Sequence, residues 1–295
     1  MICNNYAIGI DVGGTWVRVA LVDNGMRVIN KVVKKTSEFV DELTYLTSLR
    51  KMIDQVDESG VASKIGMIVP TPYKEGMTHL QDATNVGILE GITLQRIRDF
   101  FADYDVYFEN DVNVVALLES KIPVRSRYES LVYITVSTGI GSGIIINNQI
   151  WHGANGYAGE VGNMIVSQRD KNVLCVLEDV CSGLALDVAA QTFYGKNATS
   201  KSLFEAYMMG DEWAIETIDA WFEAFTDALA SLMHVINPDV FVLGGAVIDN
   251  NDWLIEELLL KTRPKLFENL RDQLVIEGSH YGSDSGILGG AQLCF

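Results

Sequence analysis

Basic clusters and cysteine pairs are both scarce in this sequence of 295 residues. It has 39 aspartate and glutamate residues against 22 lysines and arginines, so its formal net charge is −17, and the basic residues form no run. Binding to a phosphate backbone needs clustered lysine and arginine, so we expect no nucleic-acid partner and no membrane partner. The 4 cysteines are too few and too scattered for a disulfide framework, which favours a reducing compartment.

Long apolar segments are missing as well. No stretch is long enough to span a bilayer, and residues 1–6 lack the basic segment and apolar stretch of a secretory signal. We therefore expect a cytoplasmic protein. What the chain does have is material for a packed core, because apolar residues make up 48% of it and charged residues 21%. Its length suggests about two domains.

Strand-like and helix-like segments alternate along most of the chain, which predicts an α/β fold. Apolar runs that end in turn residues indicate strands, and apolar residues at helical spacing indicate helices. We expect strands at 6–12, 16–23, 26–33, 65–69, 106–108, 131–136, 144–146 and 240–243, and helices at 40–58, 94–103, 211–236 and from 284.

The most informative segment is residues 8–15, Ile-Gly-Ile-Asp-Val-Gly-Gly-Thr. It predicts a β-hairpin with a tight turn at Gly13 and Gly14. Glycines let a phosphate approach backbone N–H groups, while Thr15 offers a hydroxyl and Asp11 a carboxylate that can orient a hydrated metal ion. The alternative is an ordinary hairpin in which the glycines only make the bend.

The same design recurs about 125 residues later in the chain. The strand at 131–136 runs into Ser-Thr-Gly-Ile-Gly-Ser-Gly at 137–143, and a return strand follows. This repetition favours two related domains whose glycine turns cradle a polyphosphate, although any α/β chain contains several such turns. Neither a P-loop motif nor a dinucleotide-binding glycine motif that opens a helix is present, which argues against a P-loop NTPase and a Rossmann dehydrogenase.

Two further clusters carry side chains suited to chemistry. Glu109-Asn110-Asp111 lies between a strand and an apolar helix, where α/β proteins place functional residues. Asp111 can accept a proton from a hydroxyl that attacks a phosphoryl group, or it can simply cap the helix. Glu160, Asn163 and Glu178 suit hydrogen bonding to the vicinal hydroxyls of a sugar; the alternative is that they are ordinary exposed loop residues.

Taken in order, these motifs resemble the ROK family of bacterial sugar kinases and related repressors. The resemblance rests on Asp11-x-Gly13-Gly14-Thr15, Glu109-Asn110-Asp111, Thr138-Gly139-x-Gly141-x-Gly143, Gly159-Glu160-x-Gly162, Leu177-Glu178, Leu243-Gly244-Gly245 and the closing segment 284–291. One such motif is weak, whereas a full set in this order extends essentially from end to end of the chain.

The resemblance implies a two-domain actin-like ATPase (ribonuclease H-like) fold with ATP and sugar in the interdomain cleft. One domain would comprise residues 1–112 and the C-terminal helix 284–295, and the other residues 113–283. The implied cofactors are ATP and Mg²⁺, the ion being held mainly by phosphates and water, with Asp11 acting indirectly. A homodimer fits the family.

The resemblance also assigns roles to single residues. Asp111 matches the catalytic base, and Asn110 matches its sugar-binding neighbour. The other matches are the first phosphate loop (Asp11, Gly13, Gly14, Thr15), the second phosphate loop (Thr138, Gly139, Gly141), the turn beside the adenosine (Gly244, Gly245) and the sugar ligands (Asn85, Glu160, Glu178).

The chain departs from the family where relatives carry a zinc site of one histidine and three cysteines. Asn163 stands in place of the histidine and only Cys175 and Cys181 lie nearby, so we predict no zinc. In relatives that histidine also helps to hold the sugar, and the Asn163 amide can still bind a hydroxyl. Apolar packing is expected to support the Glu178 loop instead, through Leu174, Val176, Leu177 and Val180.

The expected activity is ATP-dependent phosphorylation of a hexose or an N-acetylhexosamine, with Asp111 as general base. Transfer to the 6-hydroxyl is implied by the family alone. The alternative is a ROK-type sugar-binding regulatory protein with little or no kinase activity. A repressor is not favoured, because only about ten residues precede Asp11, too few for a helix-turn-helix. The identity of the sugar stays open. The four histidines show no metal-ligand spacing and are expected to be structural or exposed.

Overall fold

The computed structural model describes residues 5–80, 87, 89, 92–170, 173–282 and 284–295. The chain forms two compact units. Unit 1 consists of Met1–Pro123, Gln149–Ala158 and Tyr281–Phe295, and unit 2 consists of Val124–Asn148 and Gly159–His280. No helix in the described part of the chain is long and apolar enough to cross a membrane.

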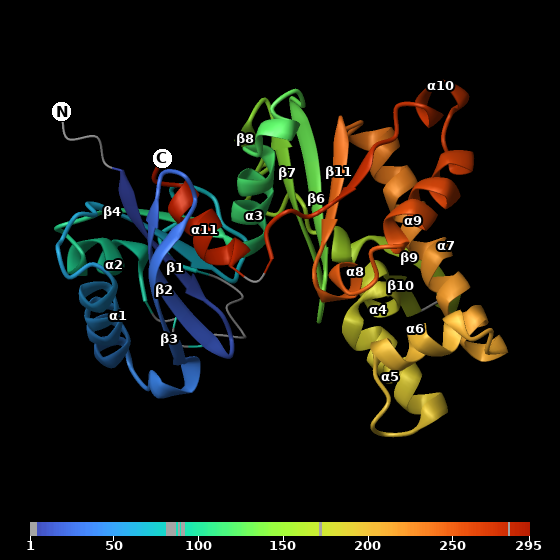
Figure 1. Ribbon diagram of the computed structural model, residues 1–295, viewed down its shortest axis with the longest axis horizontal. Helices are drawn as coiled ribbons and strands as arrows, with labels where there is room; N and C mark the ends of the chain where they lie inside the picture. Colours follow the sequence, from blue (N-terminus) through green and yellow to red (C-terminus); the bar gives the residue numbers. More distant parts are fainter. Residues whose placement is uncertain (1–4, 81–86, 88, 90–91, 171–172, 283) are drawn as a thin grey trace. The chain divides into compact units, whose positions relative to one another are not determined.

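Unit 1 is built on a five-stranded sheet in the order β3-β2-β1-β4-β5 (Figure 1). The first three strands are antiparallel neighbours, whereas β4 runs parallel to both β1 and β5. The elements are β1 (Tyr6–Val12), β2 (Trp16–Asp23), β3 (Val28–Lys35), η1 (Thr36–Glu38), α1 (Glu42–Val56), β4 (Lys64–Val69), α2 (Leu94–Phe100), β5 (Asp105–Asn110), α3 (Asp111–Ser120), the short β8 (Gln149–Ile150) and α11 (Ser285–Gln292).

Both faces of β1 are covered, and its alternating side chains serve different cores. Ile8 and Ile10 belong to a core that includes buried residues of α1 and α2. Ala7, on the opposite face, belongs to a core that includes buried residues of α3 and α11. The sheet of unit 1 is therefore sandwiched between two helical layers, which leaves its strand ends as the accessible edges.

Glycines on the second face of this sheet let α11 pack directly onto backbone. A Cβ atom at Gly9 would overlap the carbonyl of Ile287, and one at Gly66 would overlap the carbonyl of Gly290. No larger residue fits at either strand position without moving the helix. This close approach ties the end of the chain to the first strands of unit 1.

Unit 2 is built on a second sheet, in which β12, β11, β6 and β7 are neighbours in that order. β6 and β7 form an antiparallel hairpin, and β11 runs parallel to β6. The elements are β6 (Ser130–Val136), β7 (Ile140–Ile146), η4 (Val161–Asn163), β9 (Ile165–Asp170), β10 (Val173–Val176), α4 (Leu177–Cys181), α5 (Gly183–Tyr194), α6 (Ser200–Met208), α7 (Glu212–Val235), β11 (Val240–Gly244), α8 (Ala246–Asp249), α9 (Leu254–Thr262), η5 (Arg263–Lys265), α10 (Glu268–Arg271) and β12 (Ile276–Gly278).

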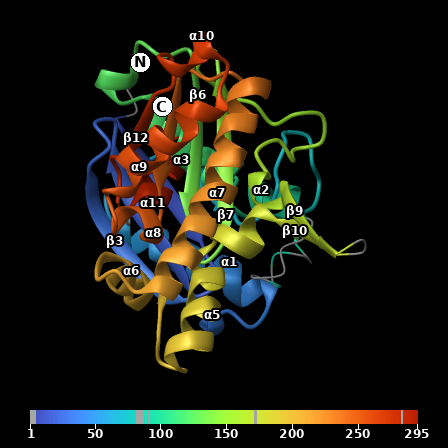
Figure 2. The same cartoon turned by 90° about the vertical axis from the view of Figure 1, so that its right-hand side faces the viewer.

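The helix α7 organises the helical layer of unit 2 (Figure 2). It packs against α4, α6 and α9. Trp221, Phe222 and Phe225 are fully buried on it, so these aromatic residues form core. Trp213, nearer the start of the helix, stacks on the exposed ring of Phe193 with ring centroids 4.1 Å apart.

Differences between the expected and observed elements have local causes. β3 begins at Val28 rather than at residue 26, because Met26 has a φ of 58° and continues the preceding turn. The expected domain boundary after residue 112 falls inside α3, which packs against α11 in unit 1. The expected set lacks the helices α4, α5, α6, α8, α9 and α10 and the strands β8, β9, β10 and β12.

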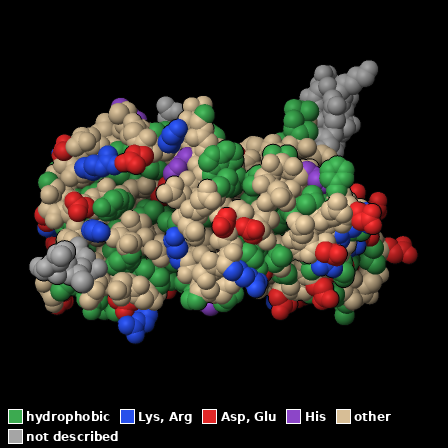
Figure 3. Space-filling view, turned by 90° about the horizontal axis from the view of Figure 1, so that it is seen from above, with side chains coloured by type: hydrophobic (Ala, Val, Ile, Leu, Met, Phe, Trp, Pro, Cys, Tyr) green, Lys and Arg blue, Asp and Glu red, His purple; other side chains and the backbone are tan. Residues whose placement is uncertain are grey.

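Charged side chains are dispersed over the face drawn in Figure 3. On the face drawn in Figure 3, lysine and arginine side chains lie in small separate groups among acidic and uncharged ones. Elsewhere in the described residues, basic side chains pair with carboxylates, as Arg50 does with Asp103 and Lys265 with Asp227, each at 2.6 Å. Such exposed pairs contribute little to stability individually.

Candidate active site

The first hairpin places a carboxylate near the end of β1. Asp11 lies opposite Arg18 in the β1–β2 register, and Asp11 Oδ2 accepts a hydrogen bond from Arg18 Nη1 at 2.8 Å. The turn that follows is closed by the Gly13 N–H, which donates to the Trp16 carbonyl at 3.0 Å. The exposed residues at its tip include Gly14 and Thr15.

The Asp11 carboxyl group lies next to two positively charged features, the Arg18 guanidinium and the N-terminus of α11. Burial raises the pKa of Asp11, and the hydrogen bond and charge of Arg18 act in the opposite direction. Asp11 also lies beside the first turn of α11, because a Cβ atom at Gly286 would be 3.2 Å from Asp11 Oδ2. The partial positive charge of a helix N-terminus favours a carboxylate there. The Asp11 carboxyl group is therefore held in place at the base of the first glycine turn.

Asn110 and Asp111 have different tasks at the end of β5. Asn110 Oδ1 accepts from the N–H groups of Val112 and Asn113 at 3.0 and 3.2 Å, and Asn110 Nδ2 donates to the Thr71 carbonyl at 3.1 Å. The alternative that Asp111 caps the helix is wrong, because Asn110 occupies the N-cap position. Asp111 is the first helical residue and is exposed.

The first hairpin and the Asn110–Asp111 pair reach the same edge of the unit 1 sheet. β1, β4 and β5 are parallel neighbours, with Asp11 opposite Ile68 and Ile68 opposite Glu109. Adjacent strands lie about 4.8 Å apart, so the backbones at Asp11 and Glu109 are separated by roughly 10 Å. The carboxyl ends of these strands therefore bring the predicted phosphate loop and the predicted base to one edge.

The second hairpin, in unit 2, is supported by close backbone packing. The Ser137 N–H donates to the Gly139 carbonyl at 2.9 Å, and the Ser137 carbonyl accepts from the Gly183 N–H at 2.7 Å. Gly245 lies behind this hairpin with a φ of 89°, and a Cβ atom there would be 2.6 Å from Thr135 Oγ1. Only glycine allows this approach. The glycine turn after β11 thus contacts the strand that leads into the second hairpin.

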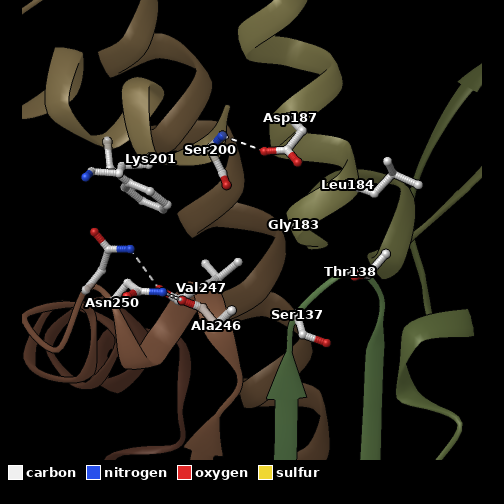
Figure 4. A pocket seen from close by; sticks show the side chains of 12 residues that line it. Ser137, Thr138, Gly183, Leu184, Asp187, Ser200, Lys201, Ala246, Val247 and Asn250 are labelled. Atoms are coloured by element: carbon white, nitrogen blue, oxygen red, sulfur yellow. Dashed lines mark hydrogen bonds between the residues drawn. The ribbon is translucent and has the colours of Figure 1, made fainter. Parts of the chain in front are cut away.

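A cavity of about 540 Å³ opens beside this hairpin within unit 2 (Figure 4). Its walls come from the β6–β7 turn and from α5, α6 and α8. The Asp187 carboxylate accepts from the Ser200 N–H at 2.6 Å, which joins the walls from α5 and α6. Asn250 Nδ2 donates to the Ala246 carbonyl, also at 2.6 Å. These bonds fix polar side chains around a partly apolar space.

The acidic residues predicted as sugar ligands in unit 2 lie near one another. Glu178 Oε2 accepts from the Ile140 N–H at 2.7 Å, so this carboxylate rests on the second hairpin. Burial raises the pKa of Glu160, and the charge of Glu178 raises it further. Asn163 lies in the same turn as Glu160, with its N–H donating to the Glu160 carbonyl at 3.2 Å, and η4 packs against α4.

The Glu178 loop has part of the expected apolar residues in buried positions. Leu177 is buried and Val176 and Val180 are half-buried, but Leu174 is 56% exposed. The loop is also joined to α7: Trp221 Nε1 donates to the Cys181 carbonyl at 2.9 Å, and Cys181 Sγ donates to the Trp221 carbonyl at 3.5 Å. Among the described residues, no group of three or more His, Cys, Asp or Glu is placed to hold a metal. The lack of zinc stays a prediction.

Each unit assembles its own part of the expected site. Unit 1 holds Asp11, Gly13, Gly14, Thr15, Asn110 and Asp111, and unit 2 holds Thr138, Gly139, Gly141, Glu160, Asn163, Glu178, Gly244 and Gly245. Asn85, an expected sugar ligand, lies outside the described residues.

The sequence motifs do not identify several residues that line the cavity or contact the end of β5. Asp187, Lys201 and Asn250 line the cavity or its rim, but polar residues of this kind are ordinary on any helix surface. His152, expected to be structural or exposed, has its Nε2 atom 2.7 Å from Oε2 of the buried Glu109. No spacing in the sequence signals that pair, because 42 residues separate its members and the sheet brings them together.

Comparison with known proteins settles the family. The sequence model of the ROK family matches residues 7–295. The chain belongs to the ROK family. This confirms the resemblance that was drawn from the motifs.

Three proteins to which the chain is similar illustrate the match. N-acetyl-D-glucosamine kinase of Haemophilus influenzae is 22% identical over 97% of this chain and 98% of its own length. A ROK hexokinase from Thermus thermophilus has a TM-score of 0.81 and 28% identity, covering 97% of this chain and 96% of that chain. A ROK family glucokinase from Streptomyces griseus, solved with glucose and AMPPNP, has a TM-score of 0.77 and 22% identity, covering 98% of both chains. The expected α/β fold of the actin-like ATPase type is confirmed.

Proposed function

We propose that this ROK protein phosphorylates a hexose or an N-acetylhexosamine at the 6-hydroxyl, using ATP and Mg²⁺, with Asp111 as general base. The expected enzyme class, a sugar kinase, is confirmed by the family and the relatives named above. The observation that carries the residue assignment is the end of β5. There Asn110 makes the cap, and the Asp111 carboxylate stands exposed at the strand edge that also holds the first glycine turn.

In the proposed reaction, Asp111 accepts the proton of the sugar hydroxyl as its oxygen attacks the γ-phosphorus of ATP. The new O–P bond forms as the bond to the leaving ADP breaks. Asn110 supports the acceptor, because only one of its two amide hydrogens is used, on the Thr71 carbonyl, among the described residues. The N–H groups of the glycine turns stabilise the negative charge of the transferring phosphoryl group.

The cavity beside the second hairpin supports the proposed nucleotide site. Its volume, about 540 Å³, lies within the usual range of roughly 300–1,000 Å³ for small-molecule pockets. Thr138 and the start of α8 form two of its walls, so phosphates near the hairpin and an adenosine near Val247 and Asn250 suit the space. Gly244 and Gly245 allow the backbone before α8 to reach this position.

The residues fit a magnesium ion held through water. Asp11 offers a single carboxylate that is already paired with Arg18, and Mg²⁺ usually keeps several waters and takes phosphate oxygens. Asp11 would hold one of those waters. The ion, when bound, would neutralise phosphate charge.

The sugar is proposed to contact Glu160, Asn163 and Glu178. Two carboxylates and an amide within one turn and one short helix offer hydrogen bonds to neighbouring hydroxyls. The raised pKa of Glu160 shows that its ionised form is poorly solvated, and hydroxyl donors from a bound sugar would relieve this.

A coupled ADP-release assay tests the proposal. The panel contains glucose, allose, mannose, fructose and the N-acetylated derivatives of glucosamine, galactosamine and mannosamine, each with and without Mg²⁺. We expect Mg²⁺-dependent turnover of at least one sugar, with NMR of the product showing a 6-phosphate. Thermal stabilisation by a sugar without turnover of any panel member would favour the regulatory alternative instead.

A further inference from the structure

We infer that His152, acting through Glu109, is a positioning residue that holds Asn110 and Asp111 in their reactive arrangement; this inference rests on the proposed function. His152 and Glu109 face each other within unit 1, with His152 Nε2 2.7 Å from Glu109 Oε2. Neither residue was expected to have such a role, and neither needs to contact the sugar or ATP.

Glu109 is the centre of the arrangement. Its side chain is 5% exposed, so its charge requires local partners. Glu109 Oε1 accepts from the Asn110 N–H at 2.9 Å and from Asn113 Nδ2 at 3.0 Å. Glu109 Oε2 is left for His152. One carboxylate thus joins the residue before the proposed base, the first turn of α3 and a loop from elsewhere in the chain.

His152 is itself held by its loop. Lys74 Nζ donates to the carbonyls of Gly153 and Ala154, at 3.3 and 2.7 Å. Gly156 has a φ of 87°, and a Cβ atom there would be 3.0 Å from the Tyr73 backbone. The loop therefore packs on the chain after β4 and presents the imidazole to Glu109. A few residues further along, the chain reaches Glu160, a proposed sugar ligand.

The consequence for Asp111 is geometric. Asn110 caps α3, and its N–H is fixed by Glu109, so the φ and ψ angles that aim Asp111 depend on the Glu109 side chain. If the imidazole is removed, Glu109 keeps a buried charge with one fewer partner and its side chain can turn toward water. Misplacement of a reacting group by about 1 Å can cost up to about 100-fold in rate.

The pair also makes the arrangement depend on pH. The hydrogen bond to Glu109 raises the pKa of His152, with burial and the Lys74 charge opposing and the Glu75 charge adding to the rise. Arg98 also lines the cavity beside the pair. Because the folded-state pKa is raised above the ordinary value near 6.5, the charged pair is complete below that value and is lost as the pH rises through the folded-state pKa.

The test compares His152→Ala and His152→Gln with the wild type on its best sugar. Glutamine keeps a neutral donor for Glu109 and removes the charge, whereas alanine removes both. We expect kcat to fall roughly 10-fold to 100-fold in His152→Ala and less in His152→Gln. The KM for ATP should stay unchanged, because the proposed nucleotide cavity lies in unit 2. In the wild type, kcat should decline at alkaline pH as His152 loses its proton. This decline should be absent from both variants.

His79→Gln is the matched control, since His79 is an exposed histidine of the same unit that contacts Thr78 and not Glu109. It should keep both the wild-type kcat and the wild-type pH profile. Cooperative thermal unfolding of each variant checks the fold, and if His152→Ala fails to fold, the pH profile of His152→Gln decides. A wild-type kcat and pH profile in His152→Gln would overturn the inference while leaving the proposed function intact. A wild type that phosphorylates no sugar would overturn both.

Discussion

The two glycine hairpins share a design but are supported in different ways. Each is an antiparallel pair whose first strand also has a parallel partner, β4 beside β1 and β11 beside β6. Behind the first hairpin stands a charged pair, Asp11 with Arg18, next to the start of α11. Behind the second stands Gly245, packed against Thr135 with no room for a side chain.

The two hairpins have the same strand arrangement but different surroundings. In unit 1, the strand edge beside the hairpin holds the carboxyl groups of Asp11 and Asp111. In unit 2, the hairpin borders a cavity and accepts close contacts from α5 and from the turn before α8. We propose that the first arrangement serves phosphoryl transfer and the second serves nucleotide and sugar recognition. Substitutions in each unit should therefore fail in different ways.

The largest effect should come from the charged edge of unit 1. Asp111→Asn removes the proposed base but keeps a side chain of the same size, so we expect kcat to fall by about 10² to 10⁴. Nucleotide binding, measured by calorimetry with AMPPNP, should change little. Asp99→Asn replaces an exposed carboxylate of α2 and should keep the wild-type kcat. A fully active Asp111→Asn enzyme would contradict the base assignment.

The packed hairpin of unit 2 should be sensitive to volume. Gly245→Ala places a Cβ atom 2.6 Å from Thr135 Oγ1 and from the Val136 carbonyl, at a φ of 89°. A non-glycine residue at such a φ costs about 1–3 kcal/mol before any clash, so the free energy of unfolding should drop by at least that much. AMPPNP should also bind more weakly.

Gly195→Ala is the control for Gly245→Ala, because it adds the same backbone strain without a steric overlap. Gly195 has a similar φ of 98°, but no atom lies within 4 Å of a Cβ there. This variant should lose stability by the backbone cost alone and keep its affinity for AMPPNP. Equal effects of the two substitutions on stability and binding would show that the close approach behind the second hairpin does not matter.

The charged hairpin of unit 1 should instead be sensitive to pH. Burial raises the pKa of Asp11, so its contribution to stability is largest below the ordinary value of 3.8 and falls as the pH rises through the folded-state pKa. Arg18→Gln removes the opposing cation and raises that pKa further. We expect a loss of about 1–2 kcal/mol at pH 7 and a smaller loss near pH 4, measured by urea unfolding.

Arg27→Gln is the comparison for this variant. Arg27 pairs with Asp23, but its side chain is 80% exposed, so its removal should leave the unfolding free energy almost unchanged at either pH. A pH-independent effect of Arg18→Gln would contradict the account of the first hairpin.

Local sequence was sufficient for the strands of the two glycine hairpins and for the chemical character of the proposed site. Apolar runs that end at Asp11 and at Ser137 predict both hairpins because strand and turn signals are short-range. The same patterns gave no account of α5, α6 and α8, which build the cavity. Their polar residues line the cavity only because three helices pack around it. The spacing of residues within one helix does not predict that packing.

The cap at α3 shows the same limit at the scale of one residue. Sequence permits either Asn110 or Asp111 to end the strand and cap the helix, because both side chains are good N-caps. The choice depends on where the β5 ladder ends, and the pairing of Val69 with Asn110 places the cap one residue earlier. Asp111 is thereby the first residue of α3, and it is exposed.

By itself, the sequence determined the family, the α/β class, the two glycine hairpins and the acidic and amide residues of the proposed site. These features depend on residue type and on neighbours in the chain, which motifs capture. Tertiary structure alone decided that the start of α11 lies beside Asp11, that Trp221 anchors the Glu178 loop, and that His152 reaches Glu109. These contacts join residues far apart in the chain, and they arise only when strands pair and helices pack.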